Sequence, residues 1–210
     1  MRSLFITATG TNVGKTHTTV KLIEALGNQG ISVGVFKPIE TGVSDTPPDA
    51  AILLEACQKV NKHFTKLTTN DITAYTLELP AAPFCADPDN HINLQYIMER
   101  HEALSALCDI LLVEGAGGLM VPITQEYMMI NLIKEMNAKA LLVTPDTLGC
   151  INETLLSILA LRTFDIDFDW CVNRDEKHTD FAKVTQPFYD AVFPGWWCLE
   201  AGLETFVNTL

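Results

Sequence analysis

The sequence predicts an α/β fold, in which helices flank both faces of a mainly parallel sheet within a single domain of residues 1–210. Two observations favour this class. Short apolar runs alternate along the chain with longer segments that carry apolar residues at helical spacing. The first apolar run is followed directly by Gly14-Lys15-Thr16 and a helix-like segment. A strand, a glycine-containing turn and a helix in this order are typical of a P-loop fold.

The expected strands are short apolar runs, and several are apolar throughout, as strands are when both of their faces are covered. They are Ser3–Thr7, Ser32–Lys37, Ala74–Leu79, Ile110–Val113, Ala140–Val143 and Asp169–Val172. In a sheet of this class ligands bind beyond the carboxyl ends of the strands. Motifs that follow strands therefore carry most of the functional information.

The expected helices fall between these strands. The first of them has Val20, Ile23 and Leu26 at helical spacing and stops near Gly30. The full set is Lys15–Asn28, Ala50–Lys62, Asn93–Leu107, Tyr127–Asn137 and Asn152–Thr163. Regular alternation of these segments with the strands predicts a parallel sheet.

Composition limits the class of partner and compartment. A hydrophobic content of 48% over 210 residues suits one domain with a substantial core. The net charge of −12 disfavours nucleic acid and anionic membranes as partners. No apolar run reaches the roughly 18–20 residues of a membrane span. The amino-terminal segment also lacks the apolar stretch of about 7–15 residues that a signal peptide needs, so we expect a cytoplasmic protein.

The cysteines show no metal-binding spacing. They are scattered without a C-x-x-C pair, at Cys57, Cys85, Cys108, Cys150, Cys171 and Cys198. In a cytoplasmic protein such residues are reduced and act as small hydrophobic side chains.

The segment T-A-T-G-T-N-V-G-K-T-H at 7–17 predicts a phosphate site. Backbone N–H groups and the start of the first helix face a phosphate there, and Gly14 lets the backbone come close. Lys15 supplies a positive charge to the β- and γ-phosphate oxygens, and Thr16 offers a hydroxyl to Mg²⁺. His17 either reaches a phosphate or lies on the helix surface. The alternative for the whole segment is an ordinary strand-turn-helix with a surface lysine.

Two further strand ends carry charged residues. In K-P-I-E-T-G (37–42) we expect Lys37 to close the second strand, with Pro38 and Gly42 marking the turn. In D-I-L-L-V-E-G-A-G-G (109–118) an apolar strand ends in Glu114, as a Walker B segment ends in the carboxylate that reaches Mg²⁺. The alternatives are a solvated lysine and a glycine-rich turn.

The start of the second helix offers another carboxylate. Asp49 is either the N-cap of that helix or a third metal ligand, and Asp45 is a competing candidate for the second role.

Four segments in the same order resemble the dethiobiotin synthetase family. They are A-T-G-T-N-V-G-K-T (8–16), K-P-I-E-T-G (37–42), V-E-G-A-G-G (113–118) and L-G-C-I-N (148–152). The family's loop is one residue longer than the strict G-x-x-x-x-G-K-[ST] pattern, so Thr9 is in register. This chain has Ala8 and Gly10 where the family has Gly and Asp, which predicts an altered loop conformation.

The resemblance implies an ATP-dependent ring closure. CO2 adds to one amine of 7,8-diaminononanoate to give a carbamate, whose oxygen attacks the γ-phosphate of ATP. The second amine then attacks the carbamic–phosphoric anhydride and expels phosphate. ATP is the co-substrate and Mg²⁺ the cofactor.

The resemblance also implies which residues do this work. The catalytic residues are Lys37, Lys15 and Thr11. The nucleotide contacts are Asn12, Val13, Gly14, Lys15, Thr16, His17, Asp49, Glu114, Gly115, Ala116, Gly117 and the base-contacting Asn173. The substrate contacts are Thr11, Lys37, Thr41, Gly118, Cys150, Ile151 and Asn152. The metal ligands are Thr16, Asp49 and Glu114.

The segment around Asn152 implies a homodimer, because in the family it comes from the second subunit. Free N–H groups at the start of the helix and the Asn152 side chain then bind the substrate's carboxylate. A simple N-cap role for Asn152 is the alternative.

Other interpretations of the chain are a ParA-like nucleotide-switch ATPase, an amidotransferase synthetase and an inactive scaffold. The first carries a signature lysine where this chain has Gly10, and the second needs a glutaminase domain. The third does not explain Lys15, Lys37 and Glu114 together.

Overall fold

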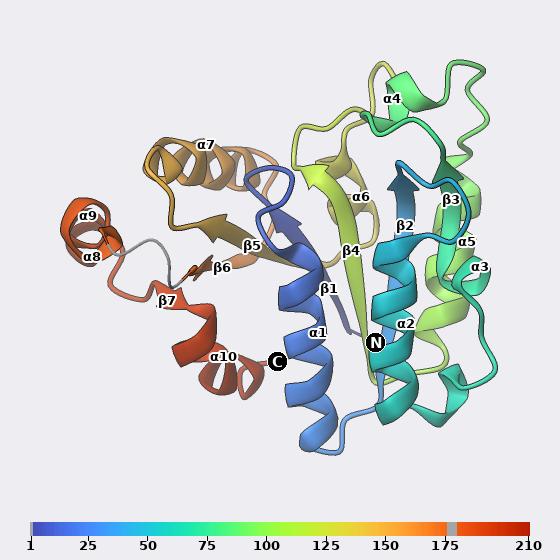
Figure 1. Ribbon diagram of the computed structural model, residues 1–210, viewed down its shortest axis with the longest axis horizontal. Helices are drawn as coiled ribbons and strands as arrows, with labels where there is room; N and C mark the ends of the chain where they lie inside the picture. The colour runs from blue at the N-terminus through green and yellow to red at the C-terminus, as the bar shows by residue number, and fades with distance from the viewer. Residues whose placement is uncertain (1, 176–179) are drawn as a thin grey trace.

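The computed structural model describes residues 2–175 and 180–210 (Figure 1). Across these residues the strands form one seven-stranded sheet in the order β3-β2-β4-β1-β5-β6-β7, and neighbouring strands are parallel throughout. The strands are β1 Arg2–Ala8, β2 Val33–Thr41, β3 Thr73–Leu77, β4 Ile110–Gly118, β5 Lys139–Pro145, β6 Phe168–Asn173 and β7 Trp197–Cys198. The predicted fold class is confirmed.

Helices cover both faces of this sheet. In Figure 1, α1 and α2 lie in front of the strands, whereas α5 and α6 lie behind them. The helices are α1 Lys15–Asn28, α2 Pro48–Val60, α3 Thr69–Ile72, α4 Pro83–Ala86, α5 Leu94–Ser105, α6 Met129–Glu135, α7 Cys150–Thr163, α8 Phe181–Val184, α9 Gln186–Val192 and α10 Leu199–Val207, with a 3₁₀ turn η1 at Lys62–Phe64. None of the helices in the described ranges has the length and apolar character that crossing a bilayer requires.

The central strands carry the core because both of their faces are buried. Phe5, Ile6, Leu112, Val113 and Leu141 are fully enclosed, which explains the apolar runs in the sequence. On the front face, α1 and α2 pack closely. A Cβ on Gly27 would lie 2.4 Å from Val60 Cγ1. This close approach joins the carboxyl-terminal ends of the two helices.

The second strand is longer than predicted. We expected it to end at Lys37 with a turn at Pro38, but β2 continues to Thr41. The strand β2 pairs with β4 as far as Phe36 and with β3 from Lys37 onward. Pro38 has no partner residue in either pairing. The missing N–H of proline therefore removes no ladder hydrogen bond, and the strand tolerates it.

Two helix starts also differ from prediction. The N-cap of α2 is Pro47, so Asp49 lies in the first turn and is not the cap. The N-cap of α7 is Gly149, so Asn152 is likewise inside its helix.

The strand β4 runs beyond Val113 to Gly118, which places Glu114 within the strand and not at its tip.

Candidate active site

The loop between β1 and α1 adopts a conformation that depends on Gly14. Its φ of +100° lies in the left-handed region, where a side chain is strained. A Cβ there would also lie 2.2 Å from Asn173 Nδ2. Asn173, the last residue of β6, donates this amide to the Val13 carbonyl over 2.9 Å. The residue expected to contact the base is thus hydrogen-bonded to the phosphate loop itself.

The Lys15 side chain curls back into the loop. Its Nζ donates to the Gly10 carbonyl over 3.3 Å, and the residue is 8% exposed. Burial, and then the positive charge of Lys37, lower the pKa of Lys15 to about 8. Nucleotide-switch ATPases carry a signature lysine at the position that Gly10 holds in this chain. Here the position offers a backbone carbonyl instead, and this carbonyl accepts the hydrogen bond from Lys15.

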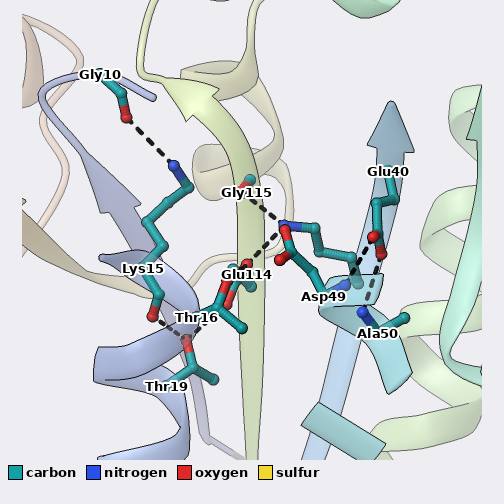
Figure 2. A network of polar contacts seen from close by, with 10 residues as sticks. Gly10, Lys15, Thr16, Thr19, Glu40, Asp49, Ala50, Glu114 and Gly115 are labelled. Carbon is teal, nitrogen blue, oxygen red and sulfur yellow. Dashed lines mark hydrogen bonds and ion pairs between the residues drawn. The ribbon is translucent and has the colours of Figure 1, made fainter. Parts of the chain in front are cut away.

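Lys37 lies between the carboxylates of Glu114 and Asp49, two residues that are labelled in Figure 2. Its Nζ is 2.6 Å from Glu114 Oε1 and 3.0 Å from Asp49 Oδ2. Burial acts to lower the pKa of Lys37, but the charges of Glu114 and then Asp49 outweigh it and raise the pKa. The lysine is therefore a fixed positive charge in the site.

Glu114 is fully buried and has a partner at each oxygen. Oε1 accepts from Lys37 and from Thr16 Oγ1 over 3.0 Å, and Oε2 lies 2.9 Å from Thr19 Oγ1. Sequence reasoning missed Thr19. Its position four residues after Lys15 on the same helix face was the available signal.

Sequence reasoning also missed Glu40, which is buried in the site. Its residue exposure is 3%, and its two oxygens accept the N–H groups of Asp49 and Ala50 over 2.8 and 2.9 Å (Figure 2). Burial raises the pKa of Glu40, and these N–H groups oppose the shift. Regular strand alternation would put Glu40 and Lys37 on opposite faces, so the sequence pattern gave no reason to group them, although in the structure both contact Asp49.

A cavity of about 430 Å³ lies at the carboxyl edge of the sheet, and Glu114 and Thr19, which are fully buried, do not line it. Its lining is Thr11, Asn12, Gly14, Lys15, Thr16, Lys37, Glu40, Thr41, Asp49, Ala116 and Gly117. Thr11 and Gly118 also line an adjoining hollow of about 310 Å³, which Leu156 and Ser157 of α7 close from the other side. A hollow of about 680 Å³ lies at the opposite edge, around Ser3 and Lys139, and holds none of the predicted site residues.

Some predicted residues lie apart from this cavity. Cys150 is buried, with its thiol 3.6 Å from Tyr189 Oη. The N–H groups of Cys150 and Asn152, which we expected to be free, donate to the carbonyls of Thr147 and Gly149. His17 lies on the surface of α1, where its Nε2 is 3.6 Å from Glu200 Oε1.

Asp45 is exposed in the loop before α2. Among the two aspartates considered for the metal, Asp49 is the one that reaches Lys37.

Similarity to known proteins identifies the family. A family profile described as an AAA domain matches residues 2–169. The chain is 64% identical to the ATP-dependent dethiobiotin synthetase BioD of Sulfurovum sp. (strain NBC37-1), with 100% of both chains covered. It is 35% identical to the protein of the same name from Wolinella succinogenes, covering 100% of this chain and 98% of that one.

Solved structures with this fold include cell-division and partition proteins. A plasmid partition protein from Borrelia burgdorferi has a TM-score of 0.62 at 9% identity, covering 100% of this chain and 99% of that chain. The MinC:MinD complex of Aquifex aeolicus gives 0.55 at 19%, covering 100% and 86%. At these identities the likeness concerns the fold alone. The curated relatives, at 64% and 35% identity over the whole chain, identify an ATP-dependent ligase instead, and the chain belongs to the ATP-dependent dethiobiotin synthetases.

Proposed function

We propose that the cavity at the carboxyl edge of the sheet converts 7,8-diaminononanoate, CO2 and ATP to dethiobiotin, ADP and phosphate. The observation that carries this proposal is the convergence of Lys15 and Lys37 from separate segments on one cavity, with the buried carboxylate of Glu114 in contact with Lys37. Two ammonium groups and a carboxylate at this place match a reaction between two anions, a carbamate and a triphosphate. Bringing such anions together is mainly a task of positioning and charge stabilisation.

The reaction proceeds in three bond-forming steps. An amine nitrogen of the substrate attacks CO2 and loses a proton, which leaves a carbamate. A carbamate oxygen then attacks the γ-phosphorus of ATP as the bond to ADP breaks. The second amine attacks the carbamate carbon, loses a proton and expels phosphate, which closes the cyclic urea.

Each lysine has a separate part in these steps. Lys37 is charged at neutral pH and faces the cavity, so it holds the carbamate's negative charge. Lys15 lies in the phosphate loop and stabilises the charge that develops between the carbamate oxygen and the γ-phosphate. Thr11 and Thr41 line the same cavity and bind the carbamate or amine end by hydrogen bonds.

The residues present fit a magnesium ion. Carboxylates of Asp49 and Glu114 and the hydroxyl of Thr16 form a set of oxygen donors, which Mg²⁺ prefers. The two carboxylates already share one cation, since the Lys37 ammonium group contacts both, and Thr16 donates its hydroxyl to Glu114. When bound, Mg²⁺ neutralises the β- and γ-phosphate oxygens.

The outer face of α7 supports a homodimer. It exposes Leu155, Leu156 and Leu159 to 37%, 59% and 61%, and Leu148 just before the helix to 91%. Exposed leucines gathered on one helix mark an interaction surface. Because Leu156 lines the hollow beside Thr11 and Gly118, a second copy docked there brings the start of its own α7, with Ile151 and Asn152, toward the substrate, whereas Cys150 is buried within its own chain.

We also place the enzyme in the cytoplasm. The six cysteines are free thiols, which fits a reducing compartment.

A reconstituted reaction tests the proposed function. Purified protein is incubated with Mg-ATP, bicarbonate and 7,8-diaminononanoate, and dethiobiotin is measured by mass spectrometry alongside released phosphate. We expect one phosphate per dethiobiotin and no product without the diamine. ATP hydrolysis stimulated by a protein or DNA partner, without ligation, would overturn the proposal in favour of a nucleotide switch.

A further inference from the structure

The amino-terminal end of α2 cannot cap itself. Its N-cap residue is Pro47, which provides no side-chain hydrogen bond, and its first helical residue is Pro48, which has no N–H. The first free donors are therefore the N–H groups of Asp49 and Ala50. The next donor, the N–H of Ala51, bonds to the Pro47 carbonyl over 3.0 Å.

Glu40 supplies the missing cap from a neighbouring strand. Its Oε1 accepts from the Asp49 N–H over 2.8 Å, and its Oε2 accepts from the Ala50 N–H over 2.9 Å. The carboxylate faces the positive end of the helix dipole and is almost completely buried. The cap is thus bidentate, charged and shielded from water.

This contact fixes the position of Asp49 at two points. Its backbone N–H is held by Glu40, and its carboxylate is held by Lys37 over 3.0 Å. Both partners belong to β2. The Asp49 side chain is 42% exposed, and the loop that precedes α2 is exposed at Ser44 and Asp45.

We propose that Glu40 is a positioning residue for the metal site, which holds Asp49 in place opposite Glu114 through the backbone of α2. The inference rests on the proposed role of Asp49 as a metal ligand. Because each oxygen of Glu40 accepts an N–H from the first turn of α2, we assign it the role of orienting Asp49. Partners of this kind tune metal affinity by holding the ligand in one orientation.

Two substitutions at Glu40 test this role. Glu40→Ala removes both acceptors. Glu40→Gln keeps the shape of the side chain but retains only one acceptor oxygen and turns an NH2 group toward the second N–H. The matched control is Glu55→Gln, which removes the same charge from an exposed position on α2, where Glu55 pairs only with Lys59. Asp49→Asn removes the proposed metal ligand itself.

Two readouts separate a positioning role from a structural one. Affinity for Mn²⁺ is measured by electron paramagnetic resonance in the presence of a non-hydrolysable ATP analogue. Exchange of the Asp49 and Ala50 amide hydrogens is followed by NMR. We expect Glu40→Ala to weaken Mn²⁺ binding by about 10–100-fold, as loss of a ligand's supporting partner does, and to accelerate exchange at both amides. Glu40→Gln should fall between Glu40→Ala and the wild type, and Glu55→Gln should match the wild type.

The outcomes distinguish this inference from the function on which it rests. Weaker Mn²⁺ binding in Asp49→Asn with unchanged binding in both Glu40 variants overturns the role of Glu40 and leaves the metal site intact. Faster amide exchange without any change in Mn²⁺ affinity also overturns it, because the cap then serves the helix alone. Unchanged Mn²⁺ binding in Asp49→Asn removes Asp49 from the metal site, and the proposal for Glu40 fails with it.

Discussion

The ammonium nitrogen of Lys37 lies 2.6 Å from a carboxylate oxygen of Glu114, and both side chains are buried. A buried pair of this kind is sensitive to the loss of one partner, because the remaining charge has no water to solvate it. The same two residues stand at the centre of the proposed chemistry. We therefore expect both the stability of the fold and the turnover of the enzyme to depend on the contact between Lys37 and Glu114.

Lys37→Ala should abolish turnover while nucleotide binding largely survives, since Lys15 and the loop backbone hold the phosphates. It should also lower the free energy of unfolding by about 3–5 kcal/mol, because Glu114 is left buried without its partner. Turnover is measured as dethiobiotin formation and stability by urea unfolding. The double variant Lys37→Ala/Glu114→Gln should regain part of the stability and none of the activity.

Lys59→Ala is the control for this pair, since Lys59 and Glu55 form an exposed ion pair on α2. Exposed pairs contribute little to stability, so this variant should behave as the wild type. Unchanged turnover in Lys37→Ala would remove Lys37 from the carbamate role.

The activity should depend on pH through Lys15. Its pKa is lowered to about 8, so the side chain is charged below that pH and becomes neutral as the pH rises through it. Loss of the charge weakens binding of the triphosphate, and kcat/KM for ATP should fall with an apparent pKa near 8, because this parameter reports the free enzyme. Lys15→Met should show a low and flat profile. A wild-type profile that stays level to pH 9.5 contradicts this prediction.

Asn173→Asp should weaken the binding of ATP, GTP and CTP by a similar factor. A carboxylate cannot donate to the Val13 carbonyl, and the loss of a hydrogen bond worth about 1 kcal/mol corresponds to roughly fivefold in affinity. Binding is measured by isothermal titration calorimetry. If ATP alone loses affinity, Asn173 reads the base, as the family resemblance implies, and the hydrogen bond to the loop is secondary.

Leu159→Glu should weaken self-association, because it places a charge on the exposed apolar face of α7. Turnover should fall together with the dimer and recover at high protein concentration. Multi-angle light scattering gives the mass, and activity is measured across a dilution series. Ile52→Glu is the control, since Ile52 on α2 is similarly exposed at 52%. A monomeric wild type with full activity would refute the shared site.

The sequence was informative where local chemistry decides the structure. The bounds of α1 were predicted without error, because apolar spacing and the glycines on either side determine its start and its end. Lys15, Thr16, Lys37 and Glu114 were placed together because the carboxyl ends of parallel strands share one edge. That rule is independent of side-chain detail.

Contacts across the sheet could not be derived from the sequence in the same way. Glu40 bonds to the backbone of a helix whose start was predicted at Ala50, so the need for an external cap at Pro47-Pro48 was not visible. Asn173 contacts the Val13 carbonyl across 160 positions of sequence. The short strand β7 has two residues, too few for any periodic pattern. Its place beside β6 depends on packing, including the stacking of Trp197 on Phe206.

The order of the strands has a consequence for synthesis on the ribosome. β1 leads into the phosphate loop and is translated before both of its sheet neighbours, β4 and β5, which begin at Ile110 and Lys139. Until those two strands have emerged, β1 is an apolar strand with neither neighbour in place, and such a strand is prone to aggregate. The phosphate loop therefore leaves the ribosome well before the strands that flank it.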